Sequence, residues 1–115
     1  MDNGPNPVRF VLLHHTAIPD PHFDLMIESA PGGPLLTWRC PHDPFTARTT
    51  PAIKIQDHRP AYLSFEGDIA GDRGHVRRIR EGEGDMTTAA DGTITLAPHL
   101  RITPTGAATW TVAPL

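Results

Sequence analysis

The sequence is poor in cysteine, in positive charge and in long apolar runs, and each shortage excludes a class of protein. Cys40 is the only cysteine, so an intramolecular disulfide and a site built from several thiolates are both excluded. A single thiol is typical of a reducing compartment, so we expect a cytoplasmic protein. No stretch approaches the roughly 18 consecutive apolar residues of a membrane-spanning helix, so we expect no membrane segment. Met1–Pro7 lacks a basic region and an apolar core, and we therefore expect no signal peptide.

Positive charge is in deficit, because ten Lys and Arg residues face thirteen Asp and Glu residues. Proteins that coat long duplexes depend on many cationic contacts to phosphates, so this balance argues against that class. It is compatible with an enzyme that binds one terminal phosphate. A chain of 115 residues with 38% hydrophobic residues can bury one core. We expect Met1–Pro7 to be a disordered or extended tail and residues 8–115 to form one domain.

Thirteen prolines and ten glycines divide the chain into short segments, which favours strands and turns over helices. Short β-branched or alternating segments separated by turns are typical of an all-β barrel or sandwich. We predict a small antiparallel β-barrel with short turns and little or no helix. The expected strands are Val8–His15, His22–Glu28, Leu35–Cys40, Ala52–Gln56, His75–Arg80, Thr93–Leu96, Leu100–Thr103 and Thr109–Val112, with Tyr62–Ile69 as a further extended segment.

Both faces of the first predicted strand are largely apolar, as expected for a barrel wall that is covered on each side. The odd-numbered residues of this strand, which end at His15, share one face. The even-numbered residues, which end at His14, share the other. In the second strand His22 and Asp24 share a face with Met26.

The most informative group is His15, His22 and Asp24. In an extended strand, residues i and i+2 point the same way about 7 Å apart, so His22 and Asp24 can converge on one ion. His15 ends the preceding strand and can supply a third ligand. Two imidazoles and a carboxylate suit Mn²⁺ or Fe²⁺, with Zn²⁺ also compatible, and leave positions open for water and substrate. The alternative is a hydrogen-bonded His-x-Asp pair with no ion.

Asp57-His58 followed by Tyr62 forms a second polar group. His58 can stabilise or protonate a phosphate oxygen, and Tyr62 can donate a hydrogen bond. On spacing alone, a capped turn with a half-buried tyrosine is the simpler interpretation.

A dense basic stretch follows, formed by Arg73, His75, Arg77, Arg78 and Arg80. In a regular strand Arg78 and Arg80 share one face and Arg77 lies on the other. The stretch either holds a nucleic-acid backbone or is a solvated edge strand whose charge prevents aggregation, and both interpretations remain open.

Trp38 is either a core anchor or a platform on which a base stacks, and burial in the core is the safer prediction. Cys40, His42 and His99 lack a supporting pattern and receive no role from spacing alone.

Several of these residues belong to a longer ordered series, which runs Phe10-Val11, His15, His22-Phe23-Asp24, Glu28, Thr37-Trp38, Pro41, Asp57-His58, Tyr62 and Phe65-Glu66-Gly67. Over Val8–Ile69 this series resembles the 3′-phosphoesterase domain of bacterial DNA ligase D. The resemblance implies a small β-barrel with its active site in a crescent-shaped groove. It also implies removal of a 3′ ribonucleoside and then of the 3′ phosphate from a primer strand, with manganese.

By this resemblance His15, His22 and Asp24 correspond to the metal ligands, His58 to a histidine that contacts the phosphate, and Tyr62 to its neighbour. The family's first metal histidine lies one residue nearer to the His-x-Asp step than His15 does. Ile18–Pro21 therefore carries an insertion, and His14 is an alternative ligand.

Three cationic positions of the family are replaced. An arginine two residues after the aspartate is Met26 here, an arginine eight residues before His58 is Thr50, and a lysine after Pro41 is His42. Loss of one phosphate contact costs about 10²–10³ in rate. The candidates to hold the phosphate instead are Arg39, Arg48, Arg73 and His42.

The sequence thus predicts a manganese-dependent hydrolase that processes DNA or RNA 3′ ends in DNA repair, with a ligase or polymerase acting in trans. Zinc or iron are alternative cofactors. Two rival functions remain open: a barrel that binds nucleic-acid ends or a protein partner without turnover, and a phosphoesterase for a small phosphorylated molecule.

Overall fold

The computed structural model describes residues 6–115, which form nine strands and one short 3₁₀ helix. The elements are β1 (Asn6–Thr16), β2 (His22–Glu28), β3 (Leu35–Cys40), β4 (Thr50–His58), η1 (Pro60–Leu63), β5 (Gly67–Asp68), β6 (His75–Thr88), β7 (Ile94–Ala97), β8 (Leu100–Pro104) and β9 (Thr109–Pro114). Within this part of the chain no helix is long and apolar enough to cross a membrane.

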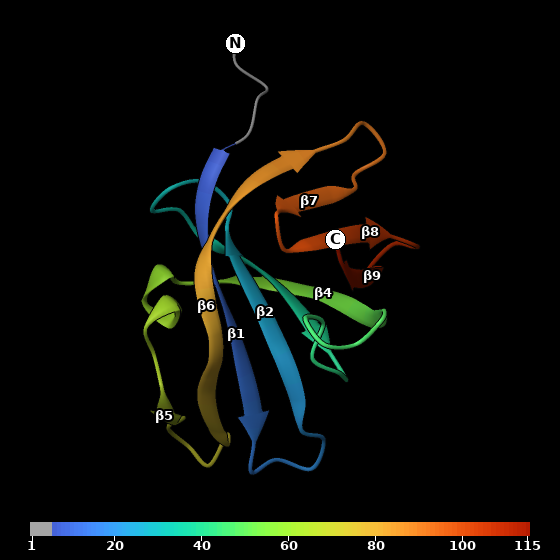
Figure 1. Ribbon diagram of the computed structural model, residues 1–115. Helices are drawn as coiled ribbons and strands as arrows, with labels where there is room; N and C mark the ends of the chain where they lie inside the picture. The colour runs from blue at the N-terminus through green and yellow to red at the C-terminus, as the bar shows by residue number, and fades with distance from the viewer. Residues whose placement is uncertain (1–5) are drawn as a thin grey trace.

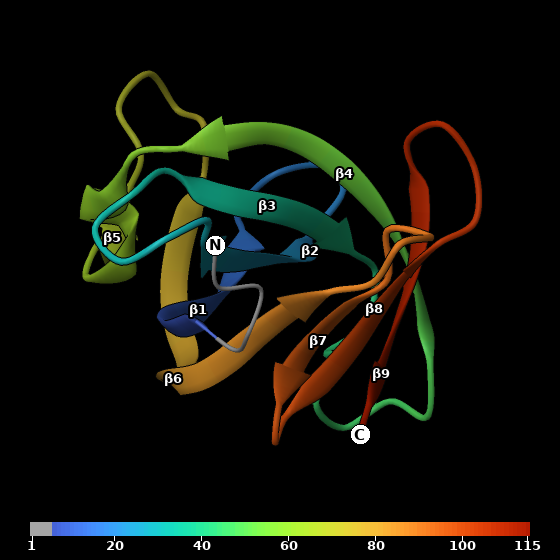
Figure 2. The same cartoon turned by 90° about the horizontal axis from the view of Figure 1, so that it is seen from above.

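The sheet closes on itself (Figure 2). Its strands follow the order β1-β2-β3-β4-β9-β8-β7-β6, and antiparallel pairing between β1 and β6 joins the two ends. Closure satisfies the backbone hydrogen bonds of strands that an open sheet would leave at its edges. β5 pairs only with β6, outside the ring. The predicted all-β class and the small antiparallel barrel are confirmed.

β4, β7, β8 and β9 differ from the predicted bounds by one or two residues at one or both ends, and β1, β6 and the segment before β5 also differ. β1 begins at Asn6, which pairs with Met86, so the barrel starts before Val8; residues 1–5 of the expected tail lie outside the described residues. β6 continues through the acidic, glycine-rich segment to Thr88, because β1 pairs with it along its length (Figure 1). The prediction that Tyr62–Ile69 is extended is wrong over its first part, where Pro60 opens η1.

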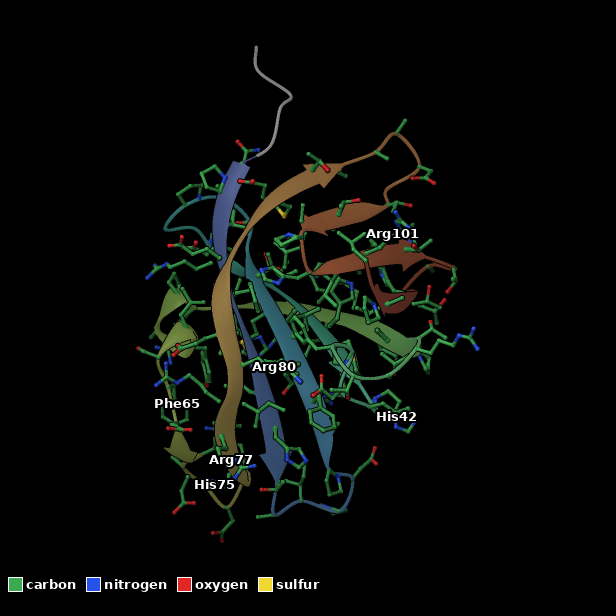
Figure 3. All side chains as sticks on the ribbon, in the orientation of Figure 1. His42, Phe65, His75, Arg77, Arg80 and Arg101 are labelled. Carbon is green, nitrogen blue, oxygen red and sulfur yellow. The ribbon has the colours of Figure 1, made fainter. Side chains whose placement is uncertain are left out.

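The hydrophobic residues form two clusters on opposite sides of the sheet. The inner cluster draws on all eight barrel strands and includes Phe10, Leu12, Leu25, Trp38, Leu96, Leu100 and Ile102. The outer cluster comprises Val11, Leu13, Met26, Leu35 and Val76, and the η1–β5 segment covers it with Tyr62, Leu63, Phe65 and Ile69 (Figures 1 and 3). The alternation along β1 predicts this arrangement, which buries both faces of its wall.

The prediction that Arg78 and Arg80 share one face is wrong, because β6 contains a β-bulge. The β1–β6 register shifts between Leu12, which pairs with Arg80, and Leu13, which pairs with Arg78. Paired residues point to the same face, so Arg78 and Arg80 lie on opposite faces. Arg80 lies over the Phe45 ring at 5.1 Å and contacts Asp43 at 3.4 Å (Figure 3). One extra residue in β6 is therefore sufficient to place these two arginines on opposite faces.

Trp38 and Cys40 both belong to the inner cluster. Trp38 is 1% exposed and packs edge-on against Trp110, so it is a core residue and no base can stack on it. Burial, together with the nearby carboxylates of Asp24 and Asp43, raises the pKa of the Cys40 thiol to about 12. The thiol therefore stays protonated at neutral pH and is a weak nucleophile.

The Glu28 carboxylate connects the end of β2 to β1 and to the β2–β3 turn. Its carboxylate is 2% exposed and accepts hydrogen bonds from the backbone N–H groups of Arg9 and Gly32 and from the Arg9 guanidinium. Burial alone would raise the pKa of Glu28, but these donors together outweigh it and the pKa is lowered.

Glu28→Gln is therefore expected to lower the free energy of unfolding at pH 7 by about 1–3 kcal/mol. A pKa that is lower in the folded state gives stability that is present above the unfolded pKa and is lost as the pH falls through the folded pKa. The difference between wild type and variant should thus shrink as the pH falls below the ordinary glutamate pKa and then through the lower folded pKa, as measured by urea denaturation. A difference independent of pH would show that the carboxylate charge contributes nothing.

Candidate metal centre

Strand register brings the three predicted ligands together on the outer face of the barrel. His15 pairs directly with His22 across β1 and β2, and Asp24 lies two residues further along β2 on the same face. His22 Nε2 lies 3.4 Å from Asp24 Oδ2, and His15 Nδ1 lies 3.8 Å from the same oxygen. One ligand atom from each residue lies within 4.8 Å of the others. An ion with ligands at about 2.1 Å requires neighbouring ligand atoms about 3–3.5 Å apart, so small side-chain movements would allow these three residues to hold one ion.

Hydrogen bonds to backbone carbonyls fix the protonation of both imidazoles. His15 Nε2 lies 2.8 Å from the carbonyl of Arg73, and His22 Nδ1 lies 2.8 Å from the carbonyl of Asp20. A carbonyl only accepts, so each of these nitrogens carries the proton. In the neutral imidazole the other nitrogen of each ring has a free lone pair, and this nitrogen lies on the side of Asp24. Metal-binding histidines are oriented in this way in many proteins.

The group contains polar atoms that the described residues leave unsatisfied. His22 Nε2 and Asp24 Oδ1 are buried and make no hydrogen bond. Asp24 is 5% exposed, and its Oδ1 has Arg39 Nε at 3.5 Å as an ion-pair partner. Buried polar atoms are almost always paired, so two orphaned atoms in one group mark a position where a ligand is expected. A divalent cation fits this donor set of two imidazole nitrogens and a carboxylate.

His14, the alternative ligand, lies on the other face of β1. Its ring stacks on Phe23 with centroids 4.5 Å apart and an interplanar angle of 8°. Ile18–Pro21, where the resemblance implies an insertion, lies in the β1–β2 loop, and His15 pairs directly with His22 before and after it. The group therefore includes His15 and not His14.

A polar cavity of about 160 Å³ adjoins the group, and His15, Asp24, His58 and Tyr62 all line it. The rings of His58 and Tyr62 pack edge to face with centroids 5.2 Å apart. η1 packs against the outer face, so both residues line the same cavity as His15 and Asp24.

Thr37 positions His58 and has no role in the sequence-based prediction. The Thr37 hydroxyl donates its hydrogen to the Leu35 carbonyl, so its oxygen accepts a hydrogen bond from His58 Nδ1–H at 3.0 Å. His58 Nε2 is then the nitrogen available to the cavity. The period of two along the strand places Thr37 and Arg39 on the same face. It does not indicate that His58 lies against this face, because that depends on how β4 and η1 fold.

Two of the four candidate phosphate-binding residues line the cavity. Arg39 reaches it from β3, and Arg73 from the turn before β6. Arg48 and His42 are exposed in the loop after β3 and do not line it (Figure 3). Met26, where the resemblance leads to the expectation of an arginine, is 2% exposed and lines the cavity.

Gly74 permits the contact between His15 and the Arg73 carbonyl. Its φ is +96°, and a Cβ built there would lie 2.6 Å from the Thr16 carbonyl oxygen and 2.8 Å from His15 Nε2. A side chain at this position is thus excluded by the backbone conformation and by packing. The local sequence does not indicate this contact, because it depends on how β6 meets β1.

Gly74→Ala is expected to displace the His15 ring and to weaken divalent-metal affinity about 10-fold or more, as for other losses of a supporting contact. Calorimetric titration with Mn²⁺ measures the change. Gly71→Ala is the matched control, because Gly71 also has a positive φ (+76°) but has only a flexible arginine side chain nearby. Equal losses of Mn²⁺ affinity in both variants would show that backbone strain in the turn, and not displacement of the His15 ring, causes the effect.

No protein-family model matches the chain, and no curated protein is significantly similar to it.

Proposed function

We propose that this protein is a metal-dependent phosphoesterase that processes the 3′ ends of nucleic acids. The observation that carries the proposal is the convergence of two correctly oriented imidazoles and a buried carboxylate beside a cavity with His58, Tyr62 and two arginines. The resemblance to the 3′-phosphoesterase domain of DNA ligase D supports the substrate class. Manganese is the expected ion, with zinc or iron as alternatives.

His15, His22 and Asp24 would hold the ion. When bound, a divalent cation supplies Lewis acidity toward a phosphate oxygen and lowers the pKa of a bound water. The carbonyls of Arg73 and Asp20 keep the two histidine rings oriented before substrate arrives. This preorganisation reduces the rearrangement needed when the phosphate enters.

His58 is the expected proton donor. In phosphodiester hydrolysis a water oxygen forms a bond to phosphorus and releases one proton to solvent, the ester P–O bond breaks, and the departing oxygen takes up a proton. With Nδ1–H held by Thr37, a protonated His58 presents Nε2–H to the cavity. Tyr62 lies against the His58 ring and has a hydroxyl that can donate to a phosphoryl oxygen.

Arg39 and Arg73 take over the charge that the family's arginines provide. Both line the cavity, and the Arg39 side chain is 45% exposed, so it can turn toward a bound anion. A guanidinium pairs with two phosphate oxygens at once, which fixes the orientation of the phosphate. The two positions thereby compensate for Met26 and Thr50.

The proposal predicts release of phosphate from an oligonucleotide with a 3′ phosphate in the presence of Mn²⁺. His58→Ala should lower kcat by about 10²–10⁴, the usual contribution of a positioned acid or base, without abolishing Mn²⁺ binding. His99→Ala is the matched control, since the His99 ring contacts the Glu83 carbonyl and does not line the polar cavity.

A wild-type protein that binds Mn²⁺ and the oligonucleotide but releases no phosphate from it would contradict the proposal and favour the binding module. Turnover of small phosphomonoesters but not of oligonucleotides would contradict the substrate class.

A further inference from the structure

A second cavity of about 290 Å³ lies next to the metal centre and differs from the first in its chemistry. Its wall is mainly apolar, formed by Pro21, Pro41, Pro51, Ala52 and Ile53, which we call the proline cleft. Ile53 is 53% exposed, and with Leu115 it is one of two large hydrophobic residues of residues 6–115 that are strongly exposed. An exposed apolar side chain at the rim of an apolar cavity is typical of a binding site for a small ligand.

The proline cleft and the metal centre share residues. His22 and Arg39 line the cleft, and the same Arg39 lines the polar cavity on the other side. Strand register explains the arrangement, because Asp24 pairs with Arg39 and Arg39 pairs with Ile53. The three residues therefore form a row across β2, β3 and β4 on one face. Adjacent strands are about 4.8 Å apart, so Ile53 lies roughly 10 Å from Asp24.

We propose that the proline cleft binds the nucleobase of the nucleoside that is esterified to the phosphate at the metal centre. This inference rests on the proposed function, and it identifies the favoured substrate as a phosphodiester with a planar aromatic base on the leaving side. Arg39 lies between the two groups of the substrate, with the phosphate on one side and the base on the other.

Three observations favour a base over another occupant. The volume lies at the lower end of the range for small-molecule sites, which suits a single ring system with its sugar. The rings of three prolines provide apolar contact for a planar base, while Asp20 supplies a polar group at the edge. The position in the Asp24–Arg39–Ile53 row places the cleft within reach of a nucleoside whose phosphate contacts Arg39.

The binding test uses two ligands that differ only in the base. Adenosine 5′-monophosphate and ribose 5-phosphate are titrated into the protein with Zn²⁺ as a diamagnetic ion, and backbone amide NMR shifts are followed. We expect adenosine 5′-monophosphate to shift Ala52, Ile53 and their neighbours and to bind on the order of tenfold more tightly. Equal affinity and the same shifts for both ligands would overturn the proposal.

The kinetic test is a cycle of two substrates and two proteins. Oligonucleotides ending in a 3′ ribonucleoside, with and without its base, are compared with wild type and Ile53→Asp. The base should raise kcat/KM about tenfold with wild type and have little effect with the variant. Leu115→Asp is the matched control, because Leu115 is 50% exposed and lines neither cavity.

The two proposals fail in different ways. Turnover that is insensitive to the base in wild type would contradict the cleft inference and leave the phosphoesterase function standing. Base-dependent binding at Ala52 and Ile53 without any turnover would support the cleft and contradict the phosphoesterase function. If Leu115→Asp removes the base effect as fully as Ile53→Asp does, the assignment to the cleft is wrong.

Discussion

Asp24→Asn is expected to lower the affinity for Mn²⁺ by about 100-fold or more. Asp24 is the one carboxylate of the group and has both imidazoles within 4 Å of its Oδ2. The substitution keeps the shape of the side chain and removes the charge on which binding of a hard divalent cation depends. Even loss of a residue that only supports a ligand costs 10–100-fold, so loss of a ligand itself should cost at least as much.

Calorimetric titration measures the affinity directly, and thermal unfolding gives a second readout. Saturating Mn²⁺ should raise the Tm of the wild-type protein by mass action and leave that of the variant unchanged. Asp68→Asn is the matched control, since the Asp68 side chain is 91% exposed and contacts only His75 among the ion pairs of residues 6–115. A variant that takes up Mn²⁺ within threefold of wild type would refute the metal centre.

Trp38→Ala is expected to lower the free energy of unfolding by about 3–5 kcal/mol, the usual cost of removing a large buried aromatic side chain. Trp38 is almost completely buried in the inner cluster, and its partners come from strands on both sides of the barrel. The surrounding closed wall has little freedom to collapse into the space that the ring leaves. Urea denaturation followed by circular dichroism measures the effect.

Trp110 provides the control for this prediction. It packs edge-on against Trp38 but is only partly buried, so Trp110→Ala should cost clearly less. Trp38→Phe should fall between the two alanine variants, because it keeps a ring and also removes an indole N–H that has no hydrogen-bond partner. A loss below about 1 kcal/mol for Trp38→Ala would contradict its place in the core.

Local alternation was sufficient to predict much of the fold. The strands His22–Glu28 and Leu35–Cys40 have the predicted bounds, and the two faces of β1 enter separate clusters as expected. The period of two along a strand is set by the backbone, so it can be read without knowledge of the neighbours. The same period placed His22 and Asp24 on one face.

Pairing between strands that are distant in sequence determined the faces of the basic residues and the length of β6, which alternation alone did not predict. The bulge opposite Leu12 and Leu13 places Arg78 and Arg80 on opposite faces. β6 is longer than predicted because β1 pairs with it. A register shift has no local signature, since it depends on how two strands far apart in sequence fit each other.

The sequence by itself determined the strand periodicity and the residue types of the site, namely two histidines and an aspartate with a histidine and tyrosine further on. Only the tertiary structure decided that His15 and not His14 joins the group, that Arg39 and Arg73 reach it, and that Thr37 and Gly74 support it. The physical reason is that side-chain chemistry and backbone period are local properties, whereas the carbonyls, hydroxyls and close contacts that orient a site come from strands joined by closure of the barrel.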